Sequence, residues 1–582
     1  MDLNSLVQTA IAGTTNSLLP FAPELILCAS IMGLLIIRML PFGEKIDAGF
    51  LTIAAAAVAL FFAGPWCSYI DAPEQGVYLF DGMIVWDSFT IAIRGLLLVF
   101  TILFVIFTKF SGVPAKEDGT DFYCMILGAI LGMCLMVSAN HLLMVFLAVE
   151  MASVPSYALA GILRGHRPSS EAALKYSIYG AGAAGVMLYG ISLLAGLVNS
   201  AHLPTIAQTL ASSVGDMSRP EQMVLVLASL MIMVGLAFKL SAVPFHFWCP
   251  DIFEGAAAEI GAFLSIASKA AALALLVRVT LGVGMIAPDR ISASDLKPAV
   301  QAEEPETAIA SLPTTSGMFA VDDEIKMDDG AHDGEVHAAS KEGPLAPVRK
   351  FMGILIAVIA AITCTFGNLA AYAQTNIKRL FAYSTIAHAG YMMMPVPAAL
   401  ALASAHPESA RDSISAIVLY LAIYMFMNLG AFAVVAFLRN TMNTEEIDDF
   451  GGLISKSPAL VICFALIMFS LVGLPPLAGF VGKFAIFARL AEGYTLTGQT
   501  HLVILLIVGG INTAISLFYY LRVVKVMTID PESDAVSTHD GPVIEWLPLA
   551  FVVAVTIPVA LLIVNWNQLT GWSTAAAQQL FG

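Results

Sequence analysis

Long apolar segments recur along the chain, each about as long as a membrane-spanning helix, with short polar connections between them. A bilayer core about 30 Å thick needs roughly 20 apolar residues of helix, and only helices or closed barrels satisfy their backbone groups there. The segments lie approximately at residues 19–40, 46–66, 86–108, 121–139, 141–163, 171–197, 221–243, 255–281, 351–373, 379–401, 413–438, 458–490, 501–527 and 545–565. This pattern predicts an all-α polytopic membrane protein with about fourteen transmembrane helices.

Two of these spans are interrupted by proline in a similar way. The seventh span ends in GLAFKLSAVPFHFWCPD, which contains Pro244, and the twelfth reads SLVGLPPLAGFVGKF, with Pro475 and Pro476. Proline lacks an amide donor, so each helix should break at membrane depth. The breaks lie five spans apart, and a five-helix unit with an odd number of crossings must repeat in inverted orientation. We therefore predict inverted repeats over residues 121–284 and 349–530, an arrangement typical of transport sites.

The remaining segments flank these two repeats. Residues 1–120 contain the first three predicted spans, and residues 531–582 contain the last span and a tail. Between the repeats, residues 285–348 include 13 Asp or Glu against 4 Lys or Arg. Because this segment is also rich in Ala, Pro and Gly, it is too polar to form a packed core and reads as a flexible loop.

Basic residues in the short connections predict the orientation, because cytoplasmic loops are enriched in Lys and Arg. Twelve follow odd-numbered spans: Arg38, Lys45, Lys109, Lys116, Arg164, Arg167, Lys378, Arg379, Arg439, Lys456, Arg522 and Lys525. Outside the acidic loop, only Arg219, Arg411 and Arg489 follow even-numbered spans. Both termini and the acidic loop are therefore expected on the extracytoplasmic side.

Composition narrows the functional classes. The chain is 58% hydrophobic and only 12% charged, with a mean hydropathy of +0.84. Its net charge of −16 comes largely from the acidic loop, so it indicates no nucleic-acid partner. The seven cysteines are scattered without a CxxC motif, which predicts neither an iron–sulfur cluster nor a zinc site. No Lys or Arg precedes Arg38, so we expect the first apolar segment to be a retained span.

Four ionisable residues fall well inside predicted spans, namely Glu150, Lys239, Lys269 and Lys483. At mid-membrane each costs about 2.5–3.5 kcal/mol, or on the order of 10 kcal/mol together, so a function is expected. Burial can lower the pKa of a lysine and a neighbouring carboxylate can raise it again, so such lysines can take up and release protons. We interpret the four as a proton relay along the membrane midplane. The alternative is a set of fixed charges bound by carbonyls that the helix breaks leave free.

Two further residues could support this relay. Lys175 lies in the sixth span, where it could form an ion pair with Glu150 or extend toward water. His388 lies in LFAYSTIAHAGYMMM and could bridge Lys269 and Lys483, since neutral imidazole both donates and accepts hydrogen bonds. A lone histidine on an apolar helix can also be hydrogen-bonded only for structural reasons.

Several motifs together resemble the antiporter-like subunit N of proton-pumping NADH:quinone oxidoreductase, respiratory complex I. The motifs are LAVEMASVPSYALAG, EAALKYSIYGA, GLAFKLSAVPFHFWCPDIFEGA, NLAAYAQTNIKRLFAYSTIAHAGYM and GLPPLAGFVGKF. The resemblance implies a translocase subunit of a bacterial inner membrane. In it, Glu150 and Lys239 would form the coupling pair of the first repeat, Lys269 the central relay, and Lys483 the terminal lysine of the second repeat.

The resemblance also implies partners and cofactors. The partners would be other membrane-arm and peripheral-arm subunits and the lipid bilayer. NADH, FMN, iron–sulfur clusters and quinone would be handled mainly by those partner subunits. This chain has no nucleotide-binding fingerprint, and we expect no cofactor or metal in it.

The sequence departs from the family pattern at the start of the eighth span. Prolines are usual there, but this chain has Ala257 and Glu259. Glu259 lies ten residues, about 15 Å of helix, before Lys269. It could receive protons at the mouth of a pathway or be a solvated acid of the first helical turn, and we favour the second interpretation.

Two other functional classes remain open. A subunit of a multisubunit cation/proton antiporter, or of a related redox-driven pump without NADH, would share the inverted repeats and the lysines. The segment TNIKRLFAYSTIAHAGYM favours the complex I interpretation. A solute permease would need a substrate pocket, and no convergent polar set beyond the relay indicates one.

Overall fold

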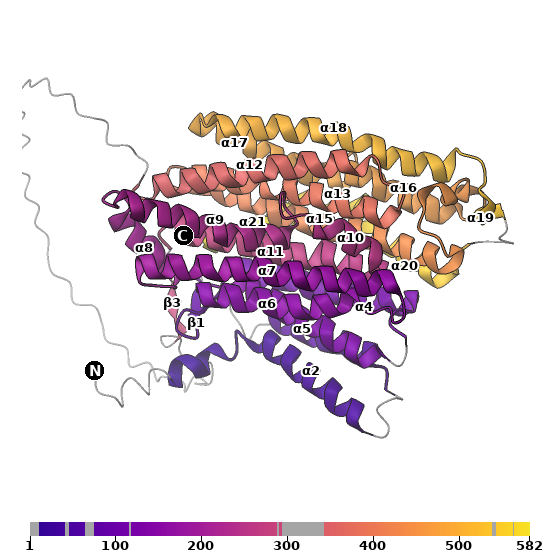
Figure 1. Ribbon diagram of the computed structural model, residues 1–582, viewed down its shortest axis with the longest axis horizontal. Coiled ribbons are helices and arrows are strands. Elements are labelled where there is room, and N and C mark those ends of the chain that lie inside the picture. Colours follow the sequence, from indigo (N-terminus) through magenta and orange to yellow (C-terminus); the bar gives the residue numbers. More distant parts are fainter. Residues whose placement is uncertain are drawn as a thin grey trace, which may run out of the picture.

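Long helices that lie side by side make up most of the protein (Figure 1). The computed structural model describes residues 11–40, 46–64, 75–115, 118–287, 290–293, 343–537, 543–562 and 564–581. Within these residues, 11 helices are long and apolar enough to cross a membrane, or up to 12 if one bent pair counts as a single span. The predicted polytopic helical class is therefore confirmed. The predicted number of about fourteen transmembrane helices is not confirmed, partly because α3 and α16 are only 16 and 15 residues long.

The chain forms the following elements. The helices up to the acidic segment are α2 (Ala22–Met39), α3 (Ala48–Ala63), α4 (Ser88–Ser111), α5 (Gly119–Ser138), α6 (Leu142–Ala160), α7 (Arg167–Val198), α8 (Leu203–Ser213), α9 (Arg219–Leu240), α10 (Trp248–Gly255) and α11 (Ala258–Gly284). Those after it are α12 (Ala346–Ala371), α13 (Ile377–Met393), α14 (Pro395–Leu402), α15 (Pro407–Met442), η4 (Ile447–Phe450), η5 (Leu453–Ser455), α16 (Pro458–Val472), α17 (Ala478–Thr497), α18 (Thr500–Thr528), α19 (Asp534–Ser537), α20 (Trp546–Leu561), α21 (Trp566–Ala577) and η6 (Gln578–Leu580).

A small sheet at one end of the helix bundle is a feature that the all-helical prediction missed. Strands β1 (Val77–Leu79) and β2 (Ile84–Trp86) form an antiparallel hairpin, and β3 (Ile291–Ser292) pairs in parallel with β1. Strands of two or three residues are too short to produce a detectable alternating pattern. Strand β3 and the start of α12 fall within the segment predicted to be a flexible loop, of which residues 294–342 lie outside the described residues.

Both predicted helix breaks are present. Helix α9 ends at Leu240, Ser241 adopts a left-handed conformation with φ 56°, and α10 begins at Trp248. Helix α16 ends at Val472, Gly473 has φ 91°, and α17 begins at Ala478. The predicted prolines lie within these two connections, where a missing amide donor breaks no helical hydrogen bond.

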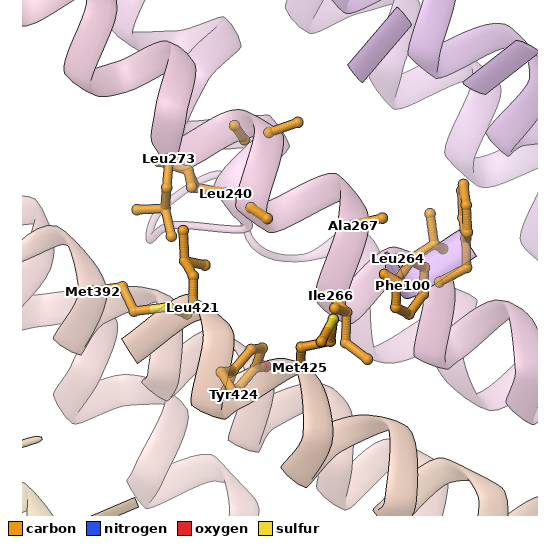
Figure 2. Packing of buried hydrophobic residues seen from close by; sticks show 14 of the residues in the cluster. Phe100, Leu240, Leu264, Ile266, Ala267, Leu273, Met392, Leu421, Tyr424 and Met425 are labelled. Carbon is orange, nitrogen blue, oxygen red and sulfur yellow. The ribbon is translucent and has the colours of Figure 1, made fainter. Parts of the chain in front are cut away.

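The core lies around α11 and α15. Helix α11 is buried along almost its entire length, whereas α2, α7 and α18 expose many large apolar side chains. In a membrane protein such exposed apolar faces suit contact with lipid or with neighbouring apolar helices. Figure 2 shows part of this core, where Leu264 of α11 lies beside Phe100 of α4 and Ile266 lies near Met425 of α15.

A buried cluster of charges connects the sheet end of the bundle to α11. Arg278 of α11 binds both carboxylate oxygens of Asp87, at 2.6 and 2.5 Å, and also Thr90 Oγ1 and the Val137 carbonyl. Arg290 lies 3.4 Å from the same carboxylate. Burial alone would raise the pKa of Asp87, but the two guanidinium groups hold it at about 2. Arg278 lies within a predicted span and was not among the ionisable residues identified from sequence.

Candidate functional site

Lys239 lies almost at the end of the first half of the broken helix, one residue before the end of α9. Its side chain is buried, and its ammonium lies 5.7 Å from the centre of the Tyr157 ring, within cation–π range. Glu150 of the adjacent helix α6 interacts electrostatically with Lys239. No ion pair within 4.0 Å joins the two among the described residues, and the buried Glu150 Oε1 has no hydrogen-bond partner in the structure. The two charges therefore influence each other without forming an ion pair.

Lys175 does not form the predicted ion pair with Glu150. Its ammonium binds Glu171 at 2.9 Å and Asp251 at 3.0 Å. Glu171 lies one turn earlier on the same helix, and Asp251 lies on the half-helix α10. The side chain of Lys175 is 36% exposed, so it reaches partners near the surface rather than the buried carboxylate of Glu150.

Lys269 lies in the middle of α11 and is 1% exposed. Its ammonium donates a hydrogen bond to the carbonyl of Leu240 at 2.9 Å. Leu240 is the last residue of α9, and the final carbonyls of a helix have no partner within that helix. These carbonyls also carry the negative end of the helix dipole, so they favour a cation.

Lys483 repeats this arrangement at the second break. It lies on α17 and donates hydrogen bonds to the carbonyls of Leu471 and Val472, at 3.0 and 2.9 Å. These residues end helix α16. The ring of Tyr391 covers the same ammonium at 4.5 Å from the ring centre. At each break, a buried lysine from another helical segment therefore binds the carbonyl end of the preceding half-helix.

His388 lies on α13, and both of its ring nitrogens are within hydrogen-bond distance of tyrosine hydroxyls. Nδ1 is 2.7 Å from Tyr420 Oη, and Nε2 is 3.2 Å from Tyr520 Oη. The ring of Tyr391 lies 6.0 Å from the His388 ring and contacts Lys483 as well. This tyrosine surrounding was not identified from sequence, because the three tyrosines come from three different helices.

Of the two lysines that His388 was expected to bridge, Lys483 is the one whose surroundings it shares, because the Tyr391 ring lies against both. In the described part of the chain, no hydrogen bond joins His388 to Lys269. Figure 2 shows Leu240, Leu273, Leu421 and Met392 grouped where α11 meets α13 and α15. Leu273 lies one turn from Lys269 and Met392 one turn from His388, so apolar side chains border both groups.

Glu259 is not the solvated acid that we favoured from sequence. It is fully buried and forms a two-point contact with Arg439 of α15, at 3.2 and 3.5 Å. Nearby, Lys378 pairs with Glu445 at 2.8 Å and also donates to the Ala256 carbonyl. The prediction was wrong because an acid in the first turn of a helix is solvated only if no other helix covers it. Here α15 covers Glu259.

A second buried ion pair joins the amino-terminal helices. Arg94 of α4, which lies within a predicted span, is 3.0 Å from Glu24 of α2, and both side chains are at most 1% exposed. Arg94 also donates to the Pro20 carbonyl at 3.1 Å. The sequence indicated such a pair only through the presence of one acid and one base in two apolar predicted spans.

A family model described as NADH:quinone oxidoreductase/Mrp antiporter, TM, matches residues 139–289 and 341–511. The chain is 33% identical to NADH-quinone oxidoreductase subunit N of Anaeromyxobacter sp. (strain Fw109-5), with 97% of each chain covered. It is similar to a chain of respiratory complex I from Thermus thermophilus, at 27% identity and a TM-score of 0.65, covering 94% of this chain and 98% of that one.

The fold is also similar to a chain of the Mrp complex from Dietzia sp. DQ12-45-1b. The TM-score is 0.68 at 14% identity, with 98% of this chain and 99% of that one covered. The chain belongs to the NADH:quinone oxidoreductase/Mrp antiporter transmembrane family, and within it to the subunit N group of NADH-quinone oxidoreductase.

Proposed function

We propose that Glu150, Lys239, Lys269 and Lys483 transfer protons within this chain, which is a proton-translocating antiporter-like membrane subunit of NADH:quinone oxidoreductase. The main support is the repeated geometry at the two helix breaks. Lys269 and Lys483 each bind carbonyls at the end of a half-helix. Carbonyl ends of broken helices are characteristic ion sites of membrane transporters.

The chemistry of proton transfer follows from the environment of the lysines. A buried ammonium is stabilised where carbonyl oxygens or a carboxylate face it, and it loses its proton more easily where they do not. In the first repeat, the charge of Glu150 favours the charged form of Lys239 without a fixed ion pair. A small movement of either helix would therefore change the proton affinity of Lys239.

His388 and Lys175 have supporting roles in this proposal. His388 connects the surroundings of Lys483 to tyrosine hydroxyls that can both donate and accept a proton. Lys175 positions the half-helix α10 through Asp251. Because α10 follows the break after Lys239, this contact limits how far the two half-helices can move.

The proposed domain organisation has two inverted repeats, at residues 121–284 and 349–530. The order of elements supports it, since α9 and α10 form the broken fourth span of the first repeat, and α16 and α17 that of the second. Residues 1–120 and 531–582 add helices on either side. The basic residues that follow odd-numbered predicted spans support extracytoplasmic termini in a bacterial inner membrane.

The relatives are named as subunit N of NADH-quinone oxidoreductase, a multisubunit enzyme. We propose that this chain assembles with other membrane-arm subunits and with a peripheral arm that handles NADH, FMN, iron–sulfur clusters and quinone. Proton transfer would then be the only chemistry of this chain. A subunit of a cation/proton antiporter is the alternative, and the likeness to the Dietzia Mrp chain supports the shared fold alone.

Purification in a mild detergent tests this assembly. We expect the tagged chain to co-purify with flavin- and iron–sulfur-containing proteins, measured by absorption spectroscopy, iron content and mass spectrometry. A stable complex with cation/proton antiporter subunits and without flavin or iron would contradict the proposal.

Replacing Lys483 with arginine tests whether its proton must be exchangeable. Arginine stays protonated in proteins, so it preserves a fixed charge but cannot pass on its proton. We expect the assembled Lys483→Arg complex to pump fewer protons per quinone reduced. The control is Lys525→Arg at an exposed lysine that pairs with Asp530. Equal pumping by both assembled variants would mean that Lys483 is only a fixed charge.

A further inference from the structure

A set of buried polar side chains leads from His388 toward one end of the molecule, between α12, α13 and α18. The Nε2 atom of His388 lies 3.2 Å from Tyr520 Oη, and that hydroxyl lies 2.5 Å from Ser384 Oγ. Tyr519 and Tyr520 are adjacent in sequence, and their rings lie 4.3 Å apart. Tyr519 in turn donates to Asn368 Oδ1 at 3.0 Å.

This set of side chains crosses much of one membrane half. His388 lies eleven residues after the start of α13, which is about 16 Å at the helical rise. Asn368 lies three residues before the end of α12, or about 5 Å. Because residues 372–376 join α12 directly to α13, these two helix ends lie at the same end of the bundle. The polar groups therefore extend from mid-membrane to within one helical turn of this end.

The outer limit of the set lies next to polar and exposed groups. The ring of Tyr372, which is 40% exposed, lies 6.2 Å from the ring of Tyr519. Arg522 donates to the Tyr372 carbonyl at 3.0 Å and also to the Gln374 carbonyl. Asn368, Tyr519 and Tyr520 themselves are buried. Burying three polar side chains in membrane-spanning helices is costly unless each has a hydrogen-bond partner, and here Tyr519 bonds Asn368 while Tyr520 bonds Ser384 and His388.

We propose that Tyr520, Tyr519 and Asn368 form a proton-access branch, which connects His388 to the surface at the α12–α13 connection. This inference rests on the proposed function and extends it by naming a route. Hydroxyl groups pass a proton along because each can accept one proton while donating another. The Asn368 amide orders the outer end of the branch, and its Nδ2 is held by Asn512 Oδ1 at 3.3 Å. With the orientation proposed above, the branch opens to the cytoplasm.

The branch is tested with variants that remove its polar groups but preserve its packing. Tyr520→Phe removes one hydroxyl, and Asn368→Leu replaces one amide with an apolar side chain of similar size. The matched control is Tyr424→Phe. The Tyr424 ring lies 5.2 Å from the His388 ring, but the two imidazole nitrogens are hydrogen-bonded to Tyr420 and Tyr520, so this variant removes a nearby hydroxyl that is outside the branch. Lys483→Ala serves as the reference for the relay itself.

Proton uptake per quinone reduced is measured in vesicles that contain the assembled complex, in H2O and in D2O. A positioned proton-transfer group typically contributes about 10²-fold or more, so we expect Tyr520→Phe and Asn368→Leu to lower the uptake rate at least about tenfold. We also expect a larger solvent isotope effect in both variants, which a purely structural defect would not produce. Tyr424→Phe should behave like the unmodified complex.

The outcomes separate this branch from the proposed function. If Tyr520→Phe and Asn368→Leu pump like Tyr424→Phe while Lys483→Ala does not pump, the branch is refuted and the relay stands. If Lys483→Ala pumps normally, the relay is refuted and the branch with it. Should Asn368→Leu fail to assemble, Tyr519→Phe removes only the hydroxyl that donates to Asn368 and makes the same test.

Discussion

Replacing Lys239 with alanine is expected to abolish most of the redox-driven proton pumping attributable to this subunit while the complex still assembles. The ammonium of Lys239 is buried beside Tyr157, and its charge interacts with Glu150. Removing it deletes a proposed proton carrier and leaves Glu150 without the cation that favours its charged form. Assembly should survive, because no ion pair of Lys239 connects helices among the described residues. Proton uptake by vesicles with the assembled complex measures the loss, alongside quinone reduction.

A matched control for this prediction is Lys525→Ala. The side chain of Lys525 is 60% exposed and its partner is Asp530. An exposed ion pair typically contributes less than about 1 kcal/mol, so this variant should pump nearly as well as the unmodified complex. Normal pumping by an assembled Lys239→Ala complex would remove Lys239 from the proton pathway.

Replacing Asp87 with asparagine is expected to destabilise the fold by about 3–5 kcal/mol, the usual cost of breaking a buried ion pair from one side. Asparagine preserves the side-chain oxygen that caps α4 through the Thr90 amide, so the change isolates the charge. Arg278 and Arg290 would then share a buried site without their common counterion. The midpoint of thermal unfolding of the purified complex, followed by loss of soluble material, measures the effect.

Asp81→Asn is the matched control, because Asp81 lies on the same hairpin but is exposed. The double variant Asp87→Asn/Arg278→Leu should recover part of the lost stability, since it also removes one unpaired charge. Equal unfolding midpoints for Asp87→Asn and Asp81→Asn would contradict the assignment of a stabilising role to this cluster.

The pKa of Asp87 also predicts how the stability of the fold depends on pH. The pKa of Asp87 in the folded protein, about 2, lies below its ordinary value of 3.8. Its contribution to stability is therefore complete above about pH 4 and is lost as the pH falls toward 2. Asp87→Asn should lack this component of acid destabilisation.

Much of the fold follows from local features of the sequence. Segments such as 86–108 and 413–438 are apolar over the length of a bilayer, and the structure has the helices α4 and α15 there. The breaks near Pro244 and Pro475 were also predictable, because a proline disrupts its own helix whatever surrounds it. The three-stranded sheet was not predictable, since its strands have at most three residues and β3 pairs across about two hundred residues.

Some residues of the candidate site were likewise predictable from the sequence, and others were not. Hydropathy alone identified Lys239, Lys269 and Lys483, because a charged residue in an apolar segment is conspicuous without any knowledge of its neighbours. It could not identify Tyr520 or Asn368, because uncharged polar residues are common in membrane helices. It also could not identify Arg278 or Glu24 as paired, since their partners lie on distant segments.

The sequence by itself determined that this chain crosses a membrane many times, that two of its helices are broken, and that ionisable groups lie at membrane depth. Each of these properties depends on residues close together in the chain. Only the tertiary structure decided which group each charge contacts: Leu240 for Lys269, Asp251 for Lys175 and Arg439 for Glu259. The physical reason is that these partners lie 29 to 180 residues away, and the lateral packing of helices selects them.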